Sequence, residues 1–387
     1  MWSDRAKNVM RQAAIRAKMI KESDRRFKLE SGDQFMVCDA GGGTVDLIVF
    51  EVTRTSAGRT LSEVTKGHGA SCGSVFLDRR FRTLLEDRFK KQDVSISAVT
   101  ISQMVDTFAN EIKPHFDEKE DQYLRLTARW NLDATSNHAA LGIEEDSMVF
   151  TGQELKEHVF DPVVEDVIKL IEIQLLQAPK CSTIFLVGGF GSSDYLSRRI
   201  RKQLEPRGLK ILVPPRPELA IVRGAVHVGL NPKVVTARIS RRFYGVETNE
   251  PFEQDKDPES TRVEEVSGSW CQKRFTCFVT KAEKLKIDQC VVREFAALKW
   301  SEIPQDFAIP LLSCDDGVSP PRHTTASGVT RLAKVCIPWP FAISDEIGKE
   351  IKVVVKMYFG LNEIKAVASI DDKDYGATIK FDAIDSY

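Results

Sequence analysis

The chain has 387 residues, of which 42% are hydrophobic and 29% are charged, and its formal net charge at pH 7 is −1. This length suggests two or three domains, the apolar content is sufficient for real cores, and the charged fraction argues against disorder. The near-zero net charge gives no basic footprint for nucleic acid, no apolar run reaches membrane-spanning length, and residues 1–7 lack the apolar core of a signal peptide.

The eight cysteines are scattered and form neither a CxxC pair nor a cysteine–histidine spacing typical of metal sites. Several lie inside apolar segments, where cysteine behaves as a small core residue. A reducing compartment is the simplest interpretation. We therefore expect the protein in the cytoplasm or the nucleus, without nucleic acid or a membrane as a partner.

The first predicted element is a basic helix at residues 3–19, with Ser3 as its N-cap and Val9, Ala13 and Ala17 on one face. Its Arg and Lys residues interleave with the apolar face, which is typical of a solvated surface helix. A short charged connector, residues 20–32, separates this helix from the next element.

Two predicted strands, residues 35–37 and 47–52, enclose the sequence Asp-Ala-Gly-Gly-Gly-Thr-Val-Asp at residues 39–46. Glycines leave backbone N–H groups unshielded, and successive N–H groups in a turn form an anion-binding concavity. Thr44 adds a hydroxyl, and Asp39 and Asp46 add the hard oxygen ligands that magnesium prefers. A glycine-rich hairpin with solvated acids is the alternative, although an ordinary hairpin needs only one or two glycines. No Gly-Lys-Ser/Thr and no helix-opening G-x-G-x-x-G is present.

A short strand at residues 61–64 is followed by a glycine-containing loop, residues 67–74, which we expect to be flexible. Helices are predicted at residues 77–89 and 102–116. His68 in the loop is more simply an exposed residue than a catalytic one. Glu111 and Lys113 in the second helix are polar candidates for a ligand contact, and a surface ion pair is the simpler interpretation.

Strands at residues 124–130 and 148–151 flank a polar insertion, and a long helix is predicted at residues 154–176. A buried strand at residues 183–187 then leads into Gly188-Gly189-Phe190-Gly191, after which Ser192 or Ser193 caps a helix. A strand, a glycine turn and a helix N-terminus form an arrangement that lets a nucleotide approach the backbone. A proline-rich connector, residues 214–217, precedes a helix at residues 218–226.

Beyond residue 232 the pattern changes to short strands separated by glycine and charged turns, which predicts a β-sandwich. Strands are expected at residues 244–248, 274–279, 334–337, 350–359, 363–370 and 377–381. Residues 304–327 are expected to form a mobile loop.

The segment 39–46 resembles the second phosphate motif of the actin-like ATPases, above all of the heat shock protein 70 chaperone family. That motif reads Asp-Leu-Gly-Gly-Gly-Thr-Phe-Asp, and this chain differs only at Ala40 and Val45. Gly188 and Gly189 match the family's adenosine motif, Val-Gly-Gly-Ser-x-Arg. Residues 218–226 resemble its Asp-Glu-Ala-Val-Ala-x-Gly-Ala-Ala helix, and residues 244–248 resemble its Leu-Gly-Ile-Glu-Thr.

The resemblance implies an α/β, actin-like (ribonuclease H-like) nucleotide-binding domain over residues 1–232, incomplete at its N-terminus. It also implies a β-rich region over residues 233–387 that resembles the peptide-binding domain and has no helical lid. ATP or ADP with Mg²⁺ is the implied cofactor, with Asp39 and Asp46 as metal ligands and Asp39, Thr44 and Asp46 as catalytic residues. The implied nucleotide contacts are Gly41, Gly42, Gly43, Thr44, Lys113, Gly188, Gly189 and Glu218.

The chain departs from the family in three places. No earlier Gly-Thr phosphate loop, catalytic lysine or Pro-Glu-x-x-Ala acid is visible, Ser192 takes the place of the arginine that stacks on adenine, and Glu218 replaces an aspartate. We therefore expect an ATP-binding, chaperone-type protein whose hydrolysis is weak or lost, with unfolded peptide or a co-chaperone as a partner. A non-catalytic interaction protein is the main alternative. A sugar or acetate kinase of the same fold is disfavoured by residues 244–248 and the β-rich end.

A final expectation concerns the sheet of the phosphate motif. The family's domain begins with strands that pair beside residues 35–37, and such strands are not visible here. We therefore expect an uncovered sheet edge and apolar surface near Met36, Val37 and Ile48. The alternative is that the helix at residues 3–19 folds over this surface.

Overall fold

The computed structural model describes residues 29–55, 58–126, 139–230, 234–265, 268–287, 289–298, 307–337, 350–359, 364–370, 373–376 and 378–381. The chain divides into two compact units, Met1–Val234 and Val235–Tyr387, and each is described by itself. In these described ranges, no helix is both long enough and apolar enough to cross a membrane.

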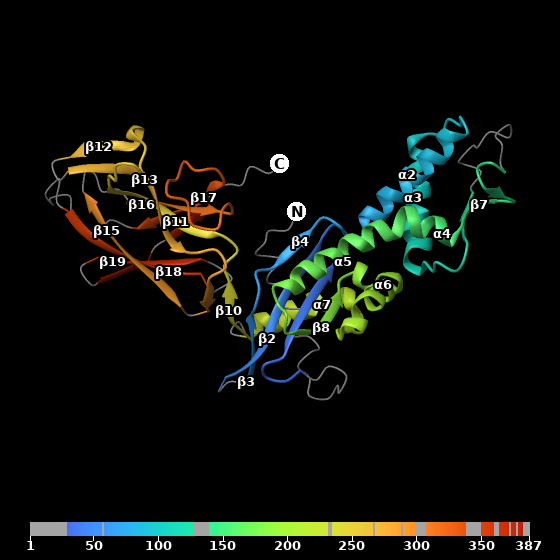
Figure 1. Ribbon diagram of the computed structural model, residues 1–387, viewed down its shortest axis with the longest axis horizontal. Coiled ribbons are helices and arrows are strands. Elements are labelled where there is room, and N and C mark those ends of the chain that lie inside the picture. The colour runs from blue at the N-terminus through green and yellow to red at the C-terminus, as the bar shows by residue number, and fades with distance from the viewer. Residues whose placement is uncertain are drawn as a thin grey trace. The chain divides into compact units, whose positions relative to one another are not determined.

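The first unit is built on a mixed sheet with the strand order β3-β2-β1-β8-β9, and β4 pairs with the first residues of β2 (Figure 1). β2 is antiparallel to both of its neighbours, β1 and β3, whereas β8 runs parallel to β1 and β9 runs parallel to β8. The strands are β1 (Gln34–Ala40), β2 (Val45–Thr55), β3 (Gly58–Glu63), β4 (His68–Ala70), β8 (Cys181–Val187) and β9 (Lys210–Leu212).

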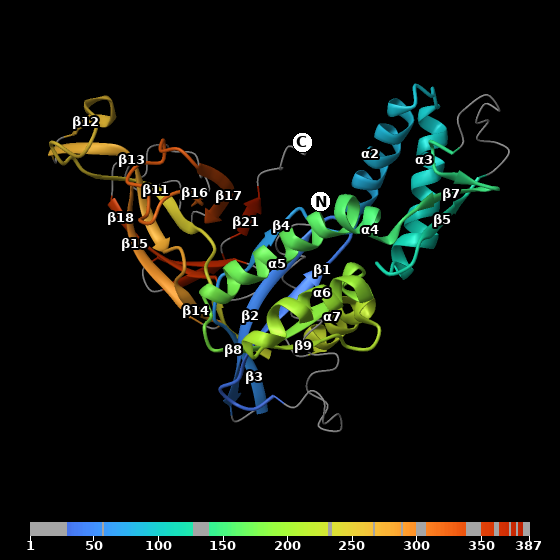
Figure 2. The same ribbon diagram turned by 45° about the vertical axis from the view of Figure 1, so that its right-hand side comes forward.

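The two faces of this sheet follow from the alternation of side chains along each strand. Met36, Cys38 and Leu47 point to the face that shares a hydrophobic core with α5 (Asp161–Leu176) and α6 (Asp194–Leu204), and Figure 2 shows α5 lying across β1 and β2. On the opposite face, Phe35 and Phe50 are fully buried and stack with ring centroids 5.9 Å apart. This mixed sheet with covering helices confirms the α/β class expected from the sequence.

A helical part of the same unit follows the first glycine turn. It contains α2 (Val75–Lys91), α3 (Ala98–Thr107), a π-helical segment η2 (Phe108–Ile112) and a 3₁₀ turn η3 (Lys113–His115). α3 starts four residues earlier than expected because the hydroxyl of Ser97, rather than Ser102, accepts the N–H of Thr100 at 3.0 Å. Phe81 stacks on Phe108 with ring centroids 4.1 Å apart, which fixes α2 against the α3–η2 segment.

Shorter elements complete the first unit. α4 (Gly152–Leu155) continues through the π-helical segment η5 (Lys156–Phe160) into α5. A three-stranded sheet has the order β5-β7-β6, with β5 (Gln122–Arg125), β6 (Ile143–Glu144) and β7 (Ser147–Phe150). The remaining elements are η6 (Phe190–Ser192), η7 (Glu205–Arg207), η8 (Pro217–Leu219) and α7 (Ala220–Leu230).

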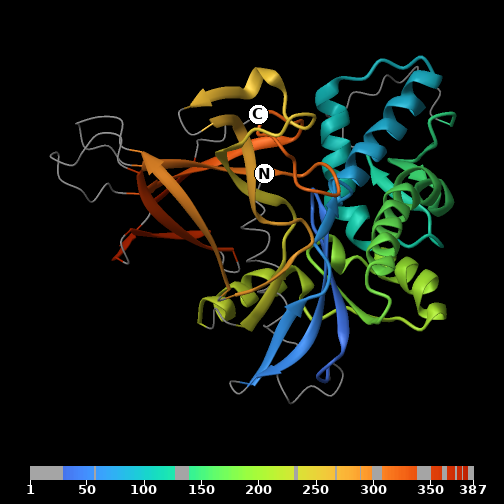
Figure 3. The same cartoon turned by 60° about the vertical axis from the view of Figure 1, so that its left-hand side comes forward.

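The second unit is a β-sandwich (Figure 3). A six-stranded sheet, β12-β13-β11-β16-β17-β21, and a four-stranded sheet, β15-β18-β19-β20, contribute to one hydrophobic core. Val353, Val355 and Met357 of β18 point into this core, as their alternation in the sequence predicts. The strands of the larger sheet are β11 (Phe243–Pro251), β12 (Arg262–Glu265), β13 (Gly268–Val279), β16 (Phe307–Cys314), β17 (Val329–Ile337) and β21 (Thr378–Phe381). The others are β15 (Cys290–Leu298), β18 (Glu350–Tyr358), β19 (Lys365–Ile370), β20 (Lys373–Gly376) and the pair β10 (Val235–Ile239) and β14 (Lys284–Lys286).

Two expectations about the sheets are wrong. β1 is not an edge, because β2 pairs with it on one side and β8 on the other, and Met36, Val37 and Ile48 are buried. Residues 304–327 are not simply a loop, since β16 lies between β11 and β17 in the larger sheet. Pro310 obscured that strand in the sequence. The helix predicted at residues 3–19 and residues 131–138 of the predicted insertion lie outside the described residues.

Candidate functional site

The first glycine turn connects β1 to β2 and is fastened to the start of α2. The N–H of Gly41 donates to the carbonyl of Thr44 at 2.9 Å, which closes the turn. The carbonyls of Gly41 and Gly42 accept the N–H groups of Ser74 and Val75, at 3.1 and 2.9 Å. The carbonyl of Gly43 accepts the N–H of Gly73 at 3.4 Å. The turn therefore caps the otherwise unpaired N–H groups at the N-terminus of α2.

This use of the carbonyls determines where the N–H groups of the turn point. In a trans peptide group the C=O and the N–H point in opposite directions. The N–H groups of Gly42, Gly43 and Thr44 consequently point away from α2, and none of them has a protein acceptor within the described ranges. Three successive N–H groups without a partner form a concavity for an anion.

Gly73 is essential for this arrangement. A Cβ atom at this position would lie 2.4 Å from the carbonyl oxygen of Gly42 and 2.6 Å from that of Gly41. Only glycine lets the loop before α2 approach the turn so closely. The sequence showed Gly73 only as part of the loop at residues 67–74, whereas the structure assigns it a definite role.

Asp39 and Asp46 face each other across the β1–β2 pair at the mouth of the turn. By the alternation of side chains they lie on the face opposite to α5 and α6. The hydroxyl of Thr44 donates to Oδ2 of Asp46 at 3.0 Å. Like charges directly opposite one another in a sheet are destabilising, so this pair is suited to a cation. Carboxylate oxygens are the ligands that Mg²⁺ uses together with waters and phosphates.

The second glycine turn lies next to the first because β8 runs parallel to β1, with Val187 opposite Asp39. Gly188 has φ +91°, and a Cβ there would lie 2.3 Å from the carbonyl oxygen of Ala40 and 2.7 Å from Oδ1 of Asp39. Its N–H donates to the carbonyl of Pro217 at 3.0 Å. The fold thus brings together residues 39–46 and 188–189, which are far apart in the sequence.

The remaining part of the second turn leads into α6. Ser193 caps this helix by accepting the N–H of Leu196 at 3.3 Å, which decides between the two serines left open by the sequence. Ser192 instead donates to the carbonyl of Gly189 at 2.6 Å. Phe190 is buried in the hydrophobic core of the unit.

Lys113 and Glu218, two of the implied nucleotide contacts, form ion pairs with other residues. Nζ of Lys113 lies 2.6 Å from Oδ1 of Asp78, and both side chains are about one fifth exposed. Asp78 is in the first turn of α2, so Lys113 lies close to the first glycine turn without reaching it. Glu218 pairs with Arg216 at 3.2 Å on the surface. The structure therefore unites the glycines, the threonine and the two aspartates, and holds Lys113 and Glu218 to other partners.

Comparison with known proteins finds similar heat shock 70 kDa proteins, although no family model matches the chain. The chain is 26% identical to heat shock 70 kDa protein 12A of Homo sapiens over 365 residues, which are 88% of this chain and 52% of that protein. It is 26% identical to the Mus musculus protein of the same name over 365 residues, with the same coverage. It is 28% identical to heat shock 70 kDa protein 12B of Homo sapiens over 289 residues, which are 69% of this chain and 42% of that protein.

These relatives support the interpretation of the chain as a divergent heat shock 70-like family member. It spans about half the length of the relatives it matches. The first glycine turn and Gly188-Gly189, which carried the resemblance in the sequence, are the segments that the fold of this heat shock 70-like chain places side by side.

The sequence missed Gly69 as a part of the site. The loop predicted to be flexible contains β4, in which Gly69 pairs with Asp46. A Cβ atom on Gly69 would lie 2.4 Å from Oδ1 of Asp46, so the carboxylate rests directly on the backbone. The Gly67-His68-Gly69 spacing was the available signal, and the neighbouring Asp46 could not be inferred from it.

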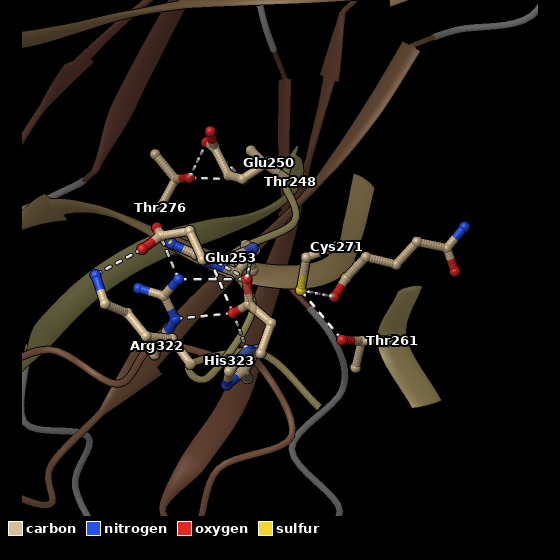
Figure 4. A network of polar contacts seen from close by, with 12 residues as sticks. Thr248, Glu250, Glu253, Thr261, Cys271, Thr276, Arg322 and His323 are labelled. Atoms are coloured by element: carbon tan, nitrogen blue, oxygen red, sulfur yellow. Dashed lines mark hydrogen bonds and ion pairs between the residues drawn. The ribbon is translucent and has the colours of Figure 1, made fainter. Parts of the chain in front are cut away.

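A second polar cluster lies in the second unit of this heat shock 70-like chain and was also missed. The side chain of Asp257 is fully buried and accepts from Arg274 at 3.0 Å, Arg322 at 2.8 Å and His323 at 2.9 Å. Figure 4 shows Arg322 and His323 converging beside Cys271. Asp257, Cys271 and His323 are close enough together to suggest a metal site, but two guanidinium groups already compensate the carboxylate, so the donor set does not fit a cation. These donors, above all Arg322, hold the pKa of Asp257 well below its ordinary range.

A pocket of about 430 Å³ also lies in the first unit. Its walls come from the loop before α2, from α2 and from η5 and α5, and include Cys72, Arg79, Arg80, His158 and Asp166. It contains none of the residues of the two glycine turns, so it is separate from the candidate site.

Proposed function

We propose that the first unit of this heat shock 70-like chain is an actin-like nucleotide-binding domain that binds ATP or ADP with Mg²⁺ at the two glycine turns. The observation that carries the proposal is a set of three N–H groups, from Gly42, Gly43 and Thr44, that have no acceptor among the described residues and lie beside the facing carboxylates of Asp39 and Asp46. The close approach of Gly188 to Ala40 and Asp39 supports the same site, because it brings the second glycine turn against the first.

Each residue has a role in this proposal. Mg²⁺, when bound, supplies positive charge shared by the phosphate oxygens and the two aspartates. Asp39 and Asp46 hold the ion and its waters, and Thr44 orients Asp46 through its hydroxyl. The N–H groups of the turn stabilise negative charge on the phosphate.

We further propose that hydrolysis is weak or absent, so that a non-catalytic, nucleotide-responsive interaction protein is the second candidate function. The observation that favours it is the Lys113–Asp78 ion pair, which neutralises the one lysine that the resemblance implies as a nucleotide contact. Phosphoryl transfer depends on cations that compensate charge developing on the phosphoryl oxygens. A lysine held by a carboxylate is not available for that purpose.

Titration calorimetry with millimolar ATP or ADP and Mg²⁺ tests the binding proposal. We expect weak binding that Asp46→Asn removes. Asp106→Asn, an exposed acid on α3, is the matched control and should bind as the unaltered chain does. No heat with either nucleotide would reject the proposed function. Steady phosphate release that Asp46→Asn abolishes would instead establish an active ATPase.

The second unit, in this proposal, contributes a β-rich peptide-binding domain, and unfolded peptide or a co-chaperone is the partner. Its sandwich of two antiparallel sheets agrees with the β-rich architecture that the resemblance implies. Fluorescence anisotropy with a labelled extended peptide measures such binding directly, and no change in anisotropy at any protein concentration would reject it.

We propose the cytoplasm or the nucleus as the location. All eight cysteines are unpaired thiols, which agrees with a reducing compartment. Fluorescence microscopy of the tagged protein tests this assignment, and a secreted protein would contradict it.

A further inference from the structure

We propose that the site recognises the phosphates of its ligand and discriminates only weakly between bases, so that ATP, GTP and inorganic tripolyphosphate are alternative ligands. This inference rests on the proposed function. It concerns which part of the ligand the protein contacts. The groups that face the phosphates and the groups implied for the nucleoside differ in this respect.

The part of the site that faces the phosphates is built mainly from backbone groups. Three N–H groups of one turn point outward together, and Gly73 and Gly188 allow backbone contacts that no other residue would permit. Gly69 adds a third such approach beside Asp46. All of these features are backbone groups or close backbone contacts around the two aspartates, and none can read the identity of a base.

The side chains nominated for the nucleoside are engaged with other protein groups. Lys113 is held by Asp78 in a half-buried ion pair. Glu218 is held by Arg216. To hydrogen-bond a base or a ribose, each would first have to leave a charged partner.

The second glycine turn offers no base-reading side chain either. The ring of Phe190 is buried in the core and is therefore unable to stack on a base. The hydroxyl of Ser192 already donates to the carbonyl of Gly189. A Cβ on Gly189 would have no neighbour within 4 Å, so the described residues form no close wall at this point.

Strong discrimination requires buried polar groups that one ligand satisfies and another leaves unpaired. A site that makes only backbone contacts with the phosphates lacks such groups. We therefore expect the dissociation constants of MgATP, MgGTP and Mg-tripolyphosphate to agree within about tenfold, which is the scale that incidental contacts produce.

The experiment is a competition assay on the full chain, in which each of the three unlabelled compounds displaces a fluorescent ATP analogue in the presence of Mg²⁺. Displacement by all three within tenfold supports the inference. Displacement by ATP at concentrations 100-fold below those of GTP and tripolyphosphate overturns it and leaves the proposed function standing. Failure of the analogue and of ATP to bind at all rejects the proposed function, and this inference with it.

A variant provides a second readout. Ser192→Arg introduces a guanidinium that can stack on a base, and should improve ATP and GTP relative to tripolyphosphate. Ser192→Ala is the matched control, because it removes only the hydrogen bond to Gly189 and should leave all three affinities unchanged. A loss of ATP preference in Ser192→Ala would show that this serine already reads the base, and would contradict the inference.

Discussion

Gly188 and Gly189 are adjacent in the sequence, yet only Gly189 has space for a side chain. Gly188 has φ +91° and no space for a Cβ atom against Ala40 and Asp39. Gly189 has φ −65° and open space around it. The shared Gly-Gly motif thus contains one residue required by geometry and one that geometry does not require.

Gly188→Ala should consequently destabilise the first unit by about 3 kcal/mol, since the left-handed backbone and the contact with Ala40 are both unfavourable for alanine. Nucleotide binding should be lost with it. Gly189→Ala should change stability by less than about 0.5 kcal/mol. Urea unfolding of the two variants measures the difference, and equal midpoints would show that the close approach of Gly188 to Asp39 is not retained in solution.

Lys113 gives a second prediction at the scale of single residues. Asp78 is one helical turn beyond Ser74, which is bonded to the glycine turn, so the pair holds a neutralised positive charge near that turn. Asp78→Asn should release Lys113 and tighten binding of tripolyphosphate several-fold, while lowering stability by about 1 kcal/mol. The double variant Asp78→Asn, Lys113→Met should lose the gain. Unchanged affinity in Asp78→Asn would show that Lys113 does not contribute to the site.

At the scale of elements, the sequence predicted strands and helices that depend on local patterns, but it did not predict pairings between distant segments. The strands on either side of the first glycine turn and most of the helix α2 followed from short-range periodicity. The pairing of β1 with β8 joins segments about 148 residues apart, and no local pattern encodes it. For this reason β1 was expected to be an edge although it is central. β16 was missed because Pro310, which pairs with Lys334 in the sheet, is normally a sign of a loop.

The position of β1 is open to measurement by native-state hydrogen exchange. Residues 36–38 and 184–187 should be protected to the same extent, up to the global stability of the first unit, because each strand has hydrogen-bonded neighbours on both sides. β9, at the end of the sheet, should exchange earlier. Early exchange of residues 36–38 with slow exchange of 184–187 would restore the exposed-edge interpretation.

At the scale of the whole molecule, the two units differ in which groups have shifted pKa values: mainly thiols in the first unit and carboxyls in the second. In the first unit burial raises the pKa of the Cys72 and Cys181 thiols to about 11 and raises that of Cys38 as well. In the second unit the pKa of Asp257 lies far below its ordinary range, chiefly through Arg322. The pKa of Glu253 is lowered to about 2, chiefly through Lys256 and then Arg322.

These shifts predict opposite pH sensitivities. A carboxyl with a lowered pKa contributes stability above its unfolded value of about 4, and loses it as the pH falls through the folded value. A thiol with a raised pKa contributes stability below its unfolded value of about 8.5, and loses it as the pH rises toward the folded value. The second unit should therefore weaken between about pH 4.5 and pH 2, and the first unit between about pH 8.5 and pH 11. Cys277, whose pKa burial also raises to about 11, adds a smaller alkaline effect to the second unit.

Scanning calorimetry across this pH range tests the prediction. Asp257→Asn leaves two guanidinium groups facing a neutral amide, and should lower the stability of the second unit by about 3 kcal/mol at neutral pH. It should also remove most of the acid dependence of the transition that it shifts. Glu253→Gln is the milder variant, because Glu253 is more exposed and Asp257 keeps its own partners. Cys181→Ala should reduce the alkaline dependence of the other transition only. If both transitions move together with pH, or if Asp257→Asn leaves the acid dependence unchanged, the separate control of the two units is wrong.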